Sequence, residues 1–257
     1  MRRERPARGP RLTSKRLDTV LVERGLAPTR SRARDMVLRG TVRIDGTPAV
    51  KPSQSVAVRA SVTTDDPAGA YVSRAALKLV AALDAHRVPV AGRHALDLGA
   101  STGGFTQVLL ERGASHVIAL DVGHDQLHPS LRADARTTVI EGANARDLTA
   151  AALPFRPDLV VSDMSFISLD LAATPALRLA VAGAWAVLLV KPQFEMGRDW
   201  IGKGGLVRAH APVEAMLRDR QAWVEGLPGW RCVALEPAPI AGADGNREYL
   251  MVARHEG

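Results

Sequence analysis

The chain has 257 residues, of which 46% are apolar and 24% are charged, as expected for a globular protein with a sizeable core. Its longest uncharged apolar run, residues 179–190, is about half of what a bilayer span needs, so we expect no membrane-spanning helix. The basic N-terminus is not followed by an apolar segment, which argues against a secretory signal, and the single cysteine, Cys232, excludes a disulfide framework and a cysteine zinc site. These features predict a cytoplasmic protein.

The formal net charge of +7 is concentrated near the N-terminus. Residues 1–60 contain fifteen Lys or Arg against five Asp or Glu, whereas the rest of the chain contains nineteen against twenty-two. A basic block of this kind indicates either a solvated tail or a polyanion partner. We expect residues 1–14 to form a basic tail, and the patterned segment that follows favours a partner.

Residues 15–58 carry the pattern of a small α+β domain. Apolar positions with helical spacing begin at Leu17, and a glycine soon afterwards can end that helix. A second helix is predicted to start at a cap formed by Thr29 or Ser31 and to stop at Gly40. Two short helices are therefore expected before the chain turns to strands.

A hairpin and a basic surface complete this domain. Val42 and Ile44 alternate with polar residues, and the dipeptide Asp45-Gly46 is a strong turn signal. Arginine pairs with phosphate through its planar fork, so the basic side chains left over for the surface suit an RNA backbone. The RNA-binding candidates in this domain are Arg16, Arg30, Arg32 and Lys51.

The stretches "TRSRARD" and "GTVRIDGTPAVKP" resemble the small RNA-binding domain shared by a ribosomal protein of the small subunit, some pseudouridine synthases and bacterial tyrosyl-tRNA synthetases. This resemblance implies that the two helices and the hairpin grip structured RNA. The next segment, 59–70, is small and polar and contains a proline and a glycine. We expect it to be a linker that buries no core.

From residue 71 onward, apolar runs alternate with helical segments, which predicts a mainly parallel sheet covered on both faces. The strands are expected within residues 93–105, 116–122, 137–142, 157–166, 185–192, 231–239 and 247–254. The last two of these indicate an antiparallel pair. Residues 71–257 are therefore expected to form a Rossmann-like α/β domain, in which ligands lie at the carboxyl ends of the strands.

Polar residues at these strand ends favour S-adenosylmethionine as the cofactor. Asp97 precedes a glycine turn that has neither the dinucleotide fingerprint nor a phosphate-loop motif. A carboxylate there would repel a pyrophosphate and attract the ammonium of a methionine moiety, while Asp121 is placed to accept hydrogen bonds from ribose hydroxyls. Asn144 and Ala145 are candidates for the adenine edge. The cofactor-binding candidates are Asp97, Gly99, Ser101, Thr102, Gly103, Phe105, Asp121, Val122, Asn144, Ala145 and Asp163.

Two lysines and two acids in the same domain indicate ribose methylation. The fourth strand ends in Asp163 and the fifth in Lys191, while Glu248 stands at the start of a late strand. Lys78 lies among Ala, Leu and Val in a predicted helix, where a lone lysine would be costly. A ribose 2′-hydroxyl is a poor nucleophile, and a lysine that has lost its proton can deprotonate it. The alternative interpretation is that the fifth strand simply ends at the surface and that Lys191 faces water.

Residues 71–254 resemble the FtsJ-like ribose 2′-O-methyltransferases, and the whole chain resembles the TlyA family of rRNA cytidine-2′-O-methyltransferases, also labelled haemolysin A. The matching stretches are "VSRAALKL", "LDLGASTGGFT", "DMSFISL", "LVKPQFE", "GKGGLVR" and "GNREYL". The resemblance implies a catalytic tetrad with Lys191 as the base; its members are Lys78, Asp163, Lys191 and Glu248. It also implies a cytidine ribose in the rRNA of the large subunit as substrate, the small subunit being left open, and an effect on susceptibility to capreomycin-type antibiotics.

Several interpretations stay open at this point. Phe166 either stacks on a flipped base or packs into the core, and with Arg74 it completes the RNA-binding candidates. The histidines show no metal spacing, so no metal is expected, and a monomer is favoured. Two other functions are possible: an inactive RNA-binding factor of ribosome assembly, against which the intact tetrad argues, and a membrane-lytic protein, against which the lack of a spanning segment argues.

Overall fold

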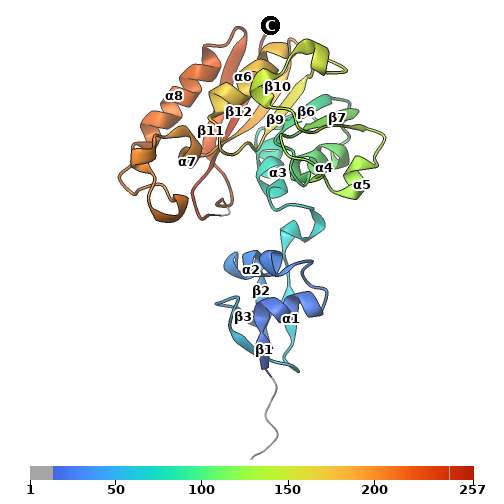
Figure 1. Cartoon of the computed structure of the whole chain (residues 1–257), viewed down its shortest axis with the longest axis vertical. Coiled ribbons are helices and arrows are strands. Elements are labelled where there is room, and N and C mark those ends of the chain that lie inside the picture. The colour runs from blue at the N-terminus through green and yellow to red at the C-terminus, as the bar shows by residue number, and fades with distance from the viewer. Residues whose placement is uncertain (1–13, 243) are drawn as a thin grey trace, which may run out of the picture. The chain divides into compact units, whose positions relative to one another are not determined.

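The computed structural model describes residues 14–242 and 244–257. The predicted basic tail, residues 1–14, lies outside the described residues except for Ser14. The chain divides into two compact units, one that ends at Gly69 and one that begins at Ala70 (Figure 1). This division falls inside the segment that we expected to be a linker.

The first unit has the two helices and the hairpin expected from its sequence. Its elements are β1 (Ser14–Arg16), α1 (Leu17–Glu23), α2 (Arg30–Leu38), β2 (Val42–Ile44), β3 (Thr47–Pro48), β4 (Ser55–Ala57), β5 (Val62–Thr64) and the 3-10 helix η1 (Pro67–Ala70), whose last residue is the first residue of the second unit. The Thr29 side chain caps α2 by accepting a hydrogen bond from the backbone N–H of Arg32 at 3.2 Å. Asp45 and Gly46 both have positive φ, as a two-residue hairpin turn requires.

The linker prediction for residues 59–70 is wrong for its first half. Strand β5 pairs antiparallel with β2, and Val62 is buried in the core of the unit. Val62 is followed by two threonines, of which Thr63 is exposed, so a single apolar side chain is enough to give this three-residue strand an inner face. Asp66 is also fixed, because both of its carboxylate oxygens accept hydrogen bonds from the Arg39 guanidinium, at 2.6 and 2.8 Å.

The second unit is built on a seven-stranded sheet in the order β11-β12-β10-β9-β6-β7-β8. Its strands are β6 (His94–Leu98), β7 (His116–Leu120), β8 (Thr137–Ile140), β9 (Leu159–Ser162), β10 (Trp185–Val190), β11 (Trp230–Pro237) and β12 (Tyr249–His255). The five strands from β10 to β8 run parallel, and β12 runs antiparallel to both β10 and β11. The predicted α/β fold and the antiparallel final pair are confirmed.

Helices cover both faces of this sheet (Figure 1). They are α3 (Ala76–Ala85), α4 (Gly104–Glu111), α5 (Pro129–Arg132), α6 (Leu169–Leu179), α7 (Pro192–Glu195) and α8 (Val213–Glu225), with the 3-10 helices η2 (Ala145–Asp147), η3 (Ala150–Ala152), η4 (Arg198–Trp200) and η5 (Lys203–Gly205). Strand β10 sends Val187 and Leu189 into a core with α3 and α4, and Leu188 and Val190 into a second core with α6 and α8. Within residues 14–242 and 244–257, every helix is too short or too polar to cross a bilayer.

Candidate active site

The predicted site residues come together because their strands end at one edge of the sheet. Asp121, Asp163 and Lys191 follow the parallel strands β7, β9 and β10 directly. Val190 pairs with Tyr249 across the antiparallel β10–β12 ladder, so Glu248, just before β12, stands at the same edge as Lys191. The carboxyl edge of a parallel sheet is where ligands bind in this architecture.

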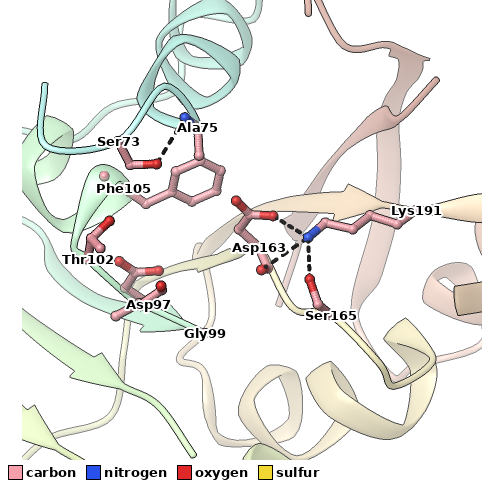
Figure 2. Close-up of a pocket in the computed structure, with 12 residues that line it drawn as sticks. Ser73, Ala75, Asp97, Gly99, Thr102, Phe105, Asp163, Ser165 and Lys191 are labelled. Carbon is pink, nitrogen blue, oxygen red and sulfur yellow. Dashed lines mark hydrogen bonds and ion pairs between the residues drawn. The ribbon is translucent and has the colours of Figure 1, made fainter. Parts of the chain in front are cut away.

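The Lys191 ammonium contacts Asp163 and Ser165 (Figure 2). Its Nζ lies 2.7 Å from Asp163 Oδ1, donates to Ser165 Oγ at 2.8 Å and lies 3.4 Å from the Asp163 carbonyl oxygen. The Lys191 side chain is 10% exposed and that of Asp163 is 19% exposed. Strand β10 therefore does not simply end at water, because Lys191, the cation that follows it, is buried and paired with a carboxylate.

The Lys78 ammonium forms a second ion pair, with Glu248. Lys78 lies on α3, which packs against β10 and β12, and the two side chains are 5% and 4% exposed. Removing two charges from water is costly unless each neutralises the other. The carboxylate of Glu248 thus explains how a lysine is tolerated among the apolar residues of α3.

Lys191 and Asp163 also line a cavity at this edge of the sheet (Figure 2). The residues that line it are Ser73, Ala75, Asp97, Gly99, Ala100, Ser101, Thr102, Gly104, Phe105, Asp163, Ser165 and Lys191. Seven of them come from the predicted glycine turn and its flanks, and five of these seven are predicted cofactor residues: Asp97, Gly99, Ser101, Thr102 and Phe105. Gly103 lies in the same turn but outside the cavity wall. The cofactor candidates of the first strand and two of the predicted catalytic residues, Asp163 and Lys191, therefore share one cavity.

Asp97 is completely buried in the wall of this cavity. Its Oδ2 accepts a hydrogen bond from Thr106 Oγ1 at 2.7 Å, while Oδ1 has no hydrogen-bond partner among the described residues. Burial raises the pKa of the Asp97 carboxyl to about 7, against the opposing effect of the Thr106 hydrogen bond and with a further rise from the negative charges of Asp163 and Asp121. A cationic ligand group would satisfy both the unpartnered oxygen and the negative charge.

Two glycines of the turn are required by their surroundings. Gly99 has φ +77°, and a Cβ there would lie 2.8 Å from the Met164 sulfur and 3.3 Å from the Asp163 carbonyl oxygen. Gly103 has φ +97°, and a Cβ there would collide with the Leu131 side chain. The turn is thus closely packed against the loop after β9 and against α5, which fixes the path of the backbone past the cavity.

The other predicted cofactor residues lie outside the cavity wall. Both oxygens of Asp121 accept backbone hydrogen bonds, from Ser101 at 2.8 Å and from Gly123 at 2.7 Å. Val122 is 64% exposed. Asn144 caps η2 by accepting from the N–H of Arg146 at 3.2 Å, and Ala145 is buried in a core. These four residues follow β7 and β8 and remain candidates for the far end of a bound nucleoside.

Phe166 is not a core residue. Its side chain is 90% exposed, and its ring packs on that of Phe194 with centroids 4.9 Å apart. Its φ of +65° is in the left-handed region, which is unusual for a bulky side chain. Arg74 lies in the loop before α3, is partly buried and has its own interaction partners. The exposed aromatic surface is compatible with stacking on a base.

The basic candidates of the first unit are ordered by acids and carbonyls. Arg16 and Arg30 both contact Asp18 Oδ2, at 2.8 and 3.2 Å, and the hydrogen bond from Arg16 holds the pKa of that buried carboxyl well below its usual range. Arg32 donates to the Ala68 carbonyl oxygen, and Lys51 is exposed. One carboxylate therefore holds two exposed guanidinium groups side by side.

Sequence reasoning missed two serines of the cavity. Ser165 accepts a hydrogen bond from Lys191 Nζ, and Ser73 Oγ accepts one from the N–H of Ala75 at 3.2 Å, just before α3. Both lie in the stretches "DMSF" and "VSRAALKL", so their closeness to Asp163 and Lys78 along the chain was the available signal. Among the described residues, no group of three potential metal ligands comes together.

Comparisons with known proteins agree with this geometry. Residues 71–255 match the FtsJ-like methyltransferase family and residues 15–60 match the S4 domain. The chain is 47% identical, over 93% of its length and 89% of the relative's, to the 16S/23S rRNA (cytidine-2′-O)-methyltransferase TlyA of Mycobacterium tuberculosis. It is 37% identical, over 91% of its length and 98% of the relative's, to Hemolysin A of Brachyspira hyodysenteriae. A solved structure from Streptococcus thermophilus has a TM-score of 0.73 at 35% identity and covers 95% of this chain and 89% of its own.

Proposed function

Because the chain belongs to the FtsJ-like methyltransferase family, we propose that it transfers a methyl group from S-adenosylmethionine to the ribose 2′-hydroxyl of a cytidine in ribosomal RNA. The observation that carries this proposal is the position of the Lys191–Asp163 pair, which lies in the wall of the same cavity as the unpartnered Asp97 carboxylate oxygen. A proton acceptor and a site for a cationic cofactor thus open into one space.

The cavity suits S-adenosylmethionine. Asp97 Oδ1 offers a buried acceptor for the amino group of the methionine moiety, and Asp121 stands at the next strand end, where ribose hydroxyls would lie. When bound, the cofactor supplies a methyl group that its sulfonium already makes electrophilic. The chain must then orient the two reactants and remove the hydroxyl proton.

Lys191 is the proposed general base. Only its neutral amine can accept the proton of the ribose hydroxyl, and its contacts with Asp163 and Ser165 hold the amine at the cavity. Asp163 orients the amine before the reaction and stabilises the ammonium that forms afterwards. Lys78 and Glu248 form the neighbouring buried pair and are proposed to fix the wall against which Lys191 and the ribose are positioned.

The first unit is proposed to bind the RNA. The S4-domain match and the paired guanidinium groups of Arg16 and Arg30 support phosphate contacts there, with Arg32 and Lys51 as further candidates. In the second unit, Phe166 is proposed to stack on the target base, since its exposed ring follows Asp163 by three residues. Arg74 remains a candidate for a phosphate contact near the cavity.

The direct test is to incubate the purified protein and S-adenosylmethionine with unmethylated small and large ribosomal subunits and to map 2′-O-methyl groups. We expect a new 2′-O-methylcytidine on the large subunit. The small subunit is tested in the same way, because the name of the mycobacterial relative includes both 16S and 23S rRNA. The Lys191→Ala variant is the control. If the wild-type protein bound subunits and left every ribose unmethylated, the inactive assembly factor would be the better explanation.

A further inference from the structure

Two segments that carry the catalytic pair are joined at successive points along their length. One is the loop of residues 163–169 after β9, and the other is residues 191–195, which include α7. The contacts are Lys191 to Asp163 and Ser165, Phe194 to Phe166, and Glu195 to Leu169. The Lys191 contacts belong to the proposed proton transfer, and the Phe166–Phe194 contact belongs to the proposed stacking on the target nucleobase. The contact of Glu195 with Leu169 belongs to neither.

Glu195 is the buried end of this series. Its side chain is 3% exposed, its Oε1 accepts the backbone N–H of Leu169 at 2.8 Å, and its Oε2 lies 3.1 Å from Arg220 on α8. Arg220 also lies 3.2 Å from Asp170. Burial raises the pKa of the Glu195 carboxyl, and the positive charge of Arg220 opposes that rise. A buried carboxylate is thus held between two helices, α6 and α8.

The Leu169 contact serves as a helix cap. Leu169 is the first residue of α6, and the side chain of the preceding residue, Ser168, makes no capping hydrogen bond. The first N–H groups of a helix need acceptors from outside the helix. Glu195 supplies one from a distant segment, so the beginning of α6, and with it the end of the loop after Asp163, is tied to α7.

The backbone at Phe166 shows why the loop needs this tie. A positive φ at a residue other than glycine is strained, and it persists only where the surroundings impose it. The exposed ring of Phe166 offers little burial to offset that strain. The loop is instead held on both sides of Phe166, by Lys191 before it and by Glu195 after it.

We propose that Glu195 is a positioning residue for methyl transfer. By fixing residues 163–169 against α7 it keeps Lys191 at the cavity and Phe166 in the conformation that presents its ring. Glu195 itself touches neither reactant, and the inference rests on the proposed function of Lys191 and Phe166. Misplacement of reacting groups by about 1 Å can cost as much as 10²-fold in rate, so a residue that acts only through geometry can still have a large effect.

The test compares Glu195→Ala and Glu195→Gln with the wild-type protein in single-turnover methyl transfer to ribosomal subunits. We expect Glu195→Ala to lower the rate by about 10-fold or more, while Glu195→Gln, whose amide oxygen can still accept from Leu169, retains more of it. S-adenosylmethionine affinity, measured by calorimetry, should stay near the wild-type value in both. Asp158→Ala and Asp158→Asn are the matched controls, because Asp158 likewise accepts a backbone N–H, from His94 at 2.7 Å, and pairs with an arginine, Arg93 at 3.5 Å, at the opposite edge of the sheet.

A double-mutant cycle separates positioning from general destabilisation. If Glu195 acts through the loop, Glu195→Ala should cost less in a Phe166→Ala background than in the wild-type background, because the residue that it positions is already gone. Equal costs in both backgrounds, a wild-type rate for Glu195→Ala, or an equal loss in Asp158→Ala would overturn the proposal. If Glu195→Ala does not fold, Glu195→Leu, which fills the buried site but offers no acceptor to the Leu169 N–H, carries the same comparisons. A wild-type protein that methylates neither subunit would overturn the proposed function and this inference together.

Discussion

The two buried ion pairs at the carboxyl edge of the sheet each join a lysine to a carboxylate, but their surroundings differ. Lys78 and Glu248 are closed off from solvent and lie outside the wall of the cavity. Lys191 and Asp163 line the cavity, and the Asp163 side chain is 19% exposed. Lys191 also donates a hydrogen bond to Ser165 Oγ, so its contacts do not depend on Asp163 alone.

On the proposed function, this difference assigns a supporting role to the first pair and a chemical role to the second. A pair without access to a ligand can stabilise the fold and shape the wall, but it cannot exchange a proton with a substrate. A pair at a cavity can change partners when a ligand enters, because water or ligand atoms can take the place of the original partner. The lysine that follows an apolar strand is therefore the one expected to act on the ribose.

The largest expected effect is that of Lys191 on the rate. Lys191→Ala should lower methyl transfer by roughly 10²–10⁴-fold, the usual contribution of a general base, with little change in cofactor or RNA affinity. Lys191→Arg should not restore the rate, because a guanidinium stays protonated. Single-turnover assays on purified subunits measure both, and an active Lys191→Arg enzyme would show that Lys191 is not the base.

The second prediction concerns stability at the closed pair. Lys78→Met leaves the Glu248 charge buried and unpaired, which should lower the free energy of unfolding by roughly 3–5 kcal/mol. Adding Glu248→Gln should recover much of that loss. Lys191→Met should cost less, since Asp163 has access to solvent. Denaturant unfolding of the wild-type protein and these three variants measures the differences, and equal losses at both lysines would mean that the two pairs are equivalent in stability.

The sequence was sufficient to predict the sheet, its final antiparallel pair and the strand ends that carry Asp97, Asp163 and Lys191. Apolar runs of this length report local structure directly. The acidic partner of each lysine could not be predicted from the sequence. The Lys78–Glu248 contact, for example, joins residues 170 positions apart, and it depends on the register in which β12 pairs with β10. That contact depends on the packing of distant elements.

Short or single-residue signals were missed for a related reason. Strand β5 has only three residues, and Val62 alone gives it an inner face, so its composition resembled a linker. Glu195 appeared as one polar residue after an apolar strand, and its bonds to Leu169 and Arg220 exist only after α6, α7 and α8 have packed. Burial of a charge by tertiary contacts has no local pattern.

The third prediction concerns the cofactor end of the cavity. Asp97→Asn should weaken S-adenosylmethionine binding by about 10- to 100-fold, as expected for the loss of a charge-assisted hydrogen bond worth roughly 1.5–3 kcal/mol. In the wild-type protein the raised pKa of Asp97, about 7, means that the carboxyl is protonated below that pH and ionised above it. Cofactor affinity should therefore rise as the pH increases through about 7.

Calorimetry across this pH range measures that dependence, and the Asp97→Asn variant should lose it. The pKa of Asp97 in the folded protein lies above the ordinary value of 3.8. The free energy of unfolding of the cofactor-free protein should therefore fall as the pH rises from about 4 to about 7, because in this range the carboxyl is ionised in the unfolded chain and still protonated in the folded one. Asp158→Asn, the same change at the other edge of the sheet, serves as the control. A pH dependence that survives in Asp97→Asn would have to come from another group.

The smallest expected effect is that of single phosphate contacts in the first unit. Arg30 and Lys51 are both exposed, and replacing them with Ala leaves Asp18 paired with Arg16 at 2.8 Å, so the fold of the unit should be kept. RNA binding should weaken, and the slope of log K against log salt should flatten by roughly 0.7–0.9 for each phosphate that is no longer neutralised. Cofactor affinity should not change.

Arg231→Ala, which removes a 70% exposed arginine of β11, is the matched control. Titration of ribosomal subunits at several salt concentrations gives the slopes. If the double variant keeps the wild-type slope, the basic side chains of the first unit are a solvated surface, and RNA recognition must be sought around the cavity of the second unit.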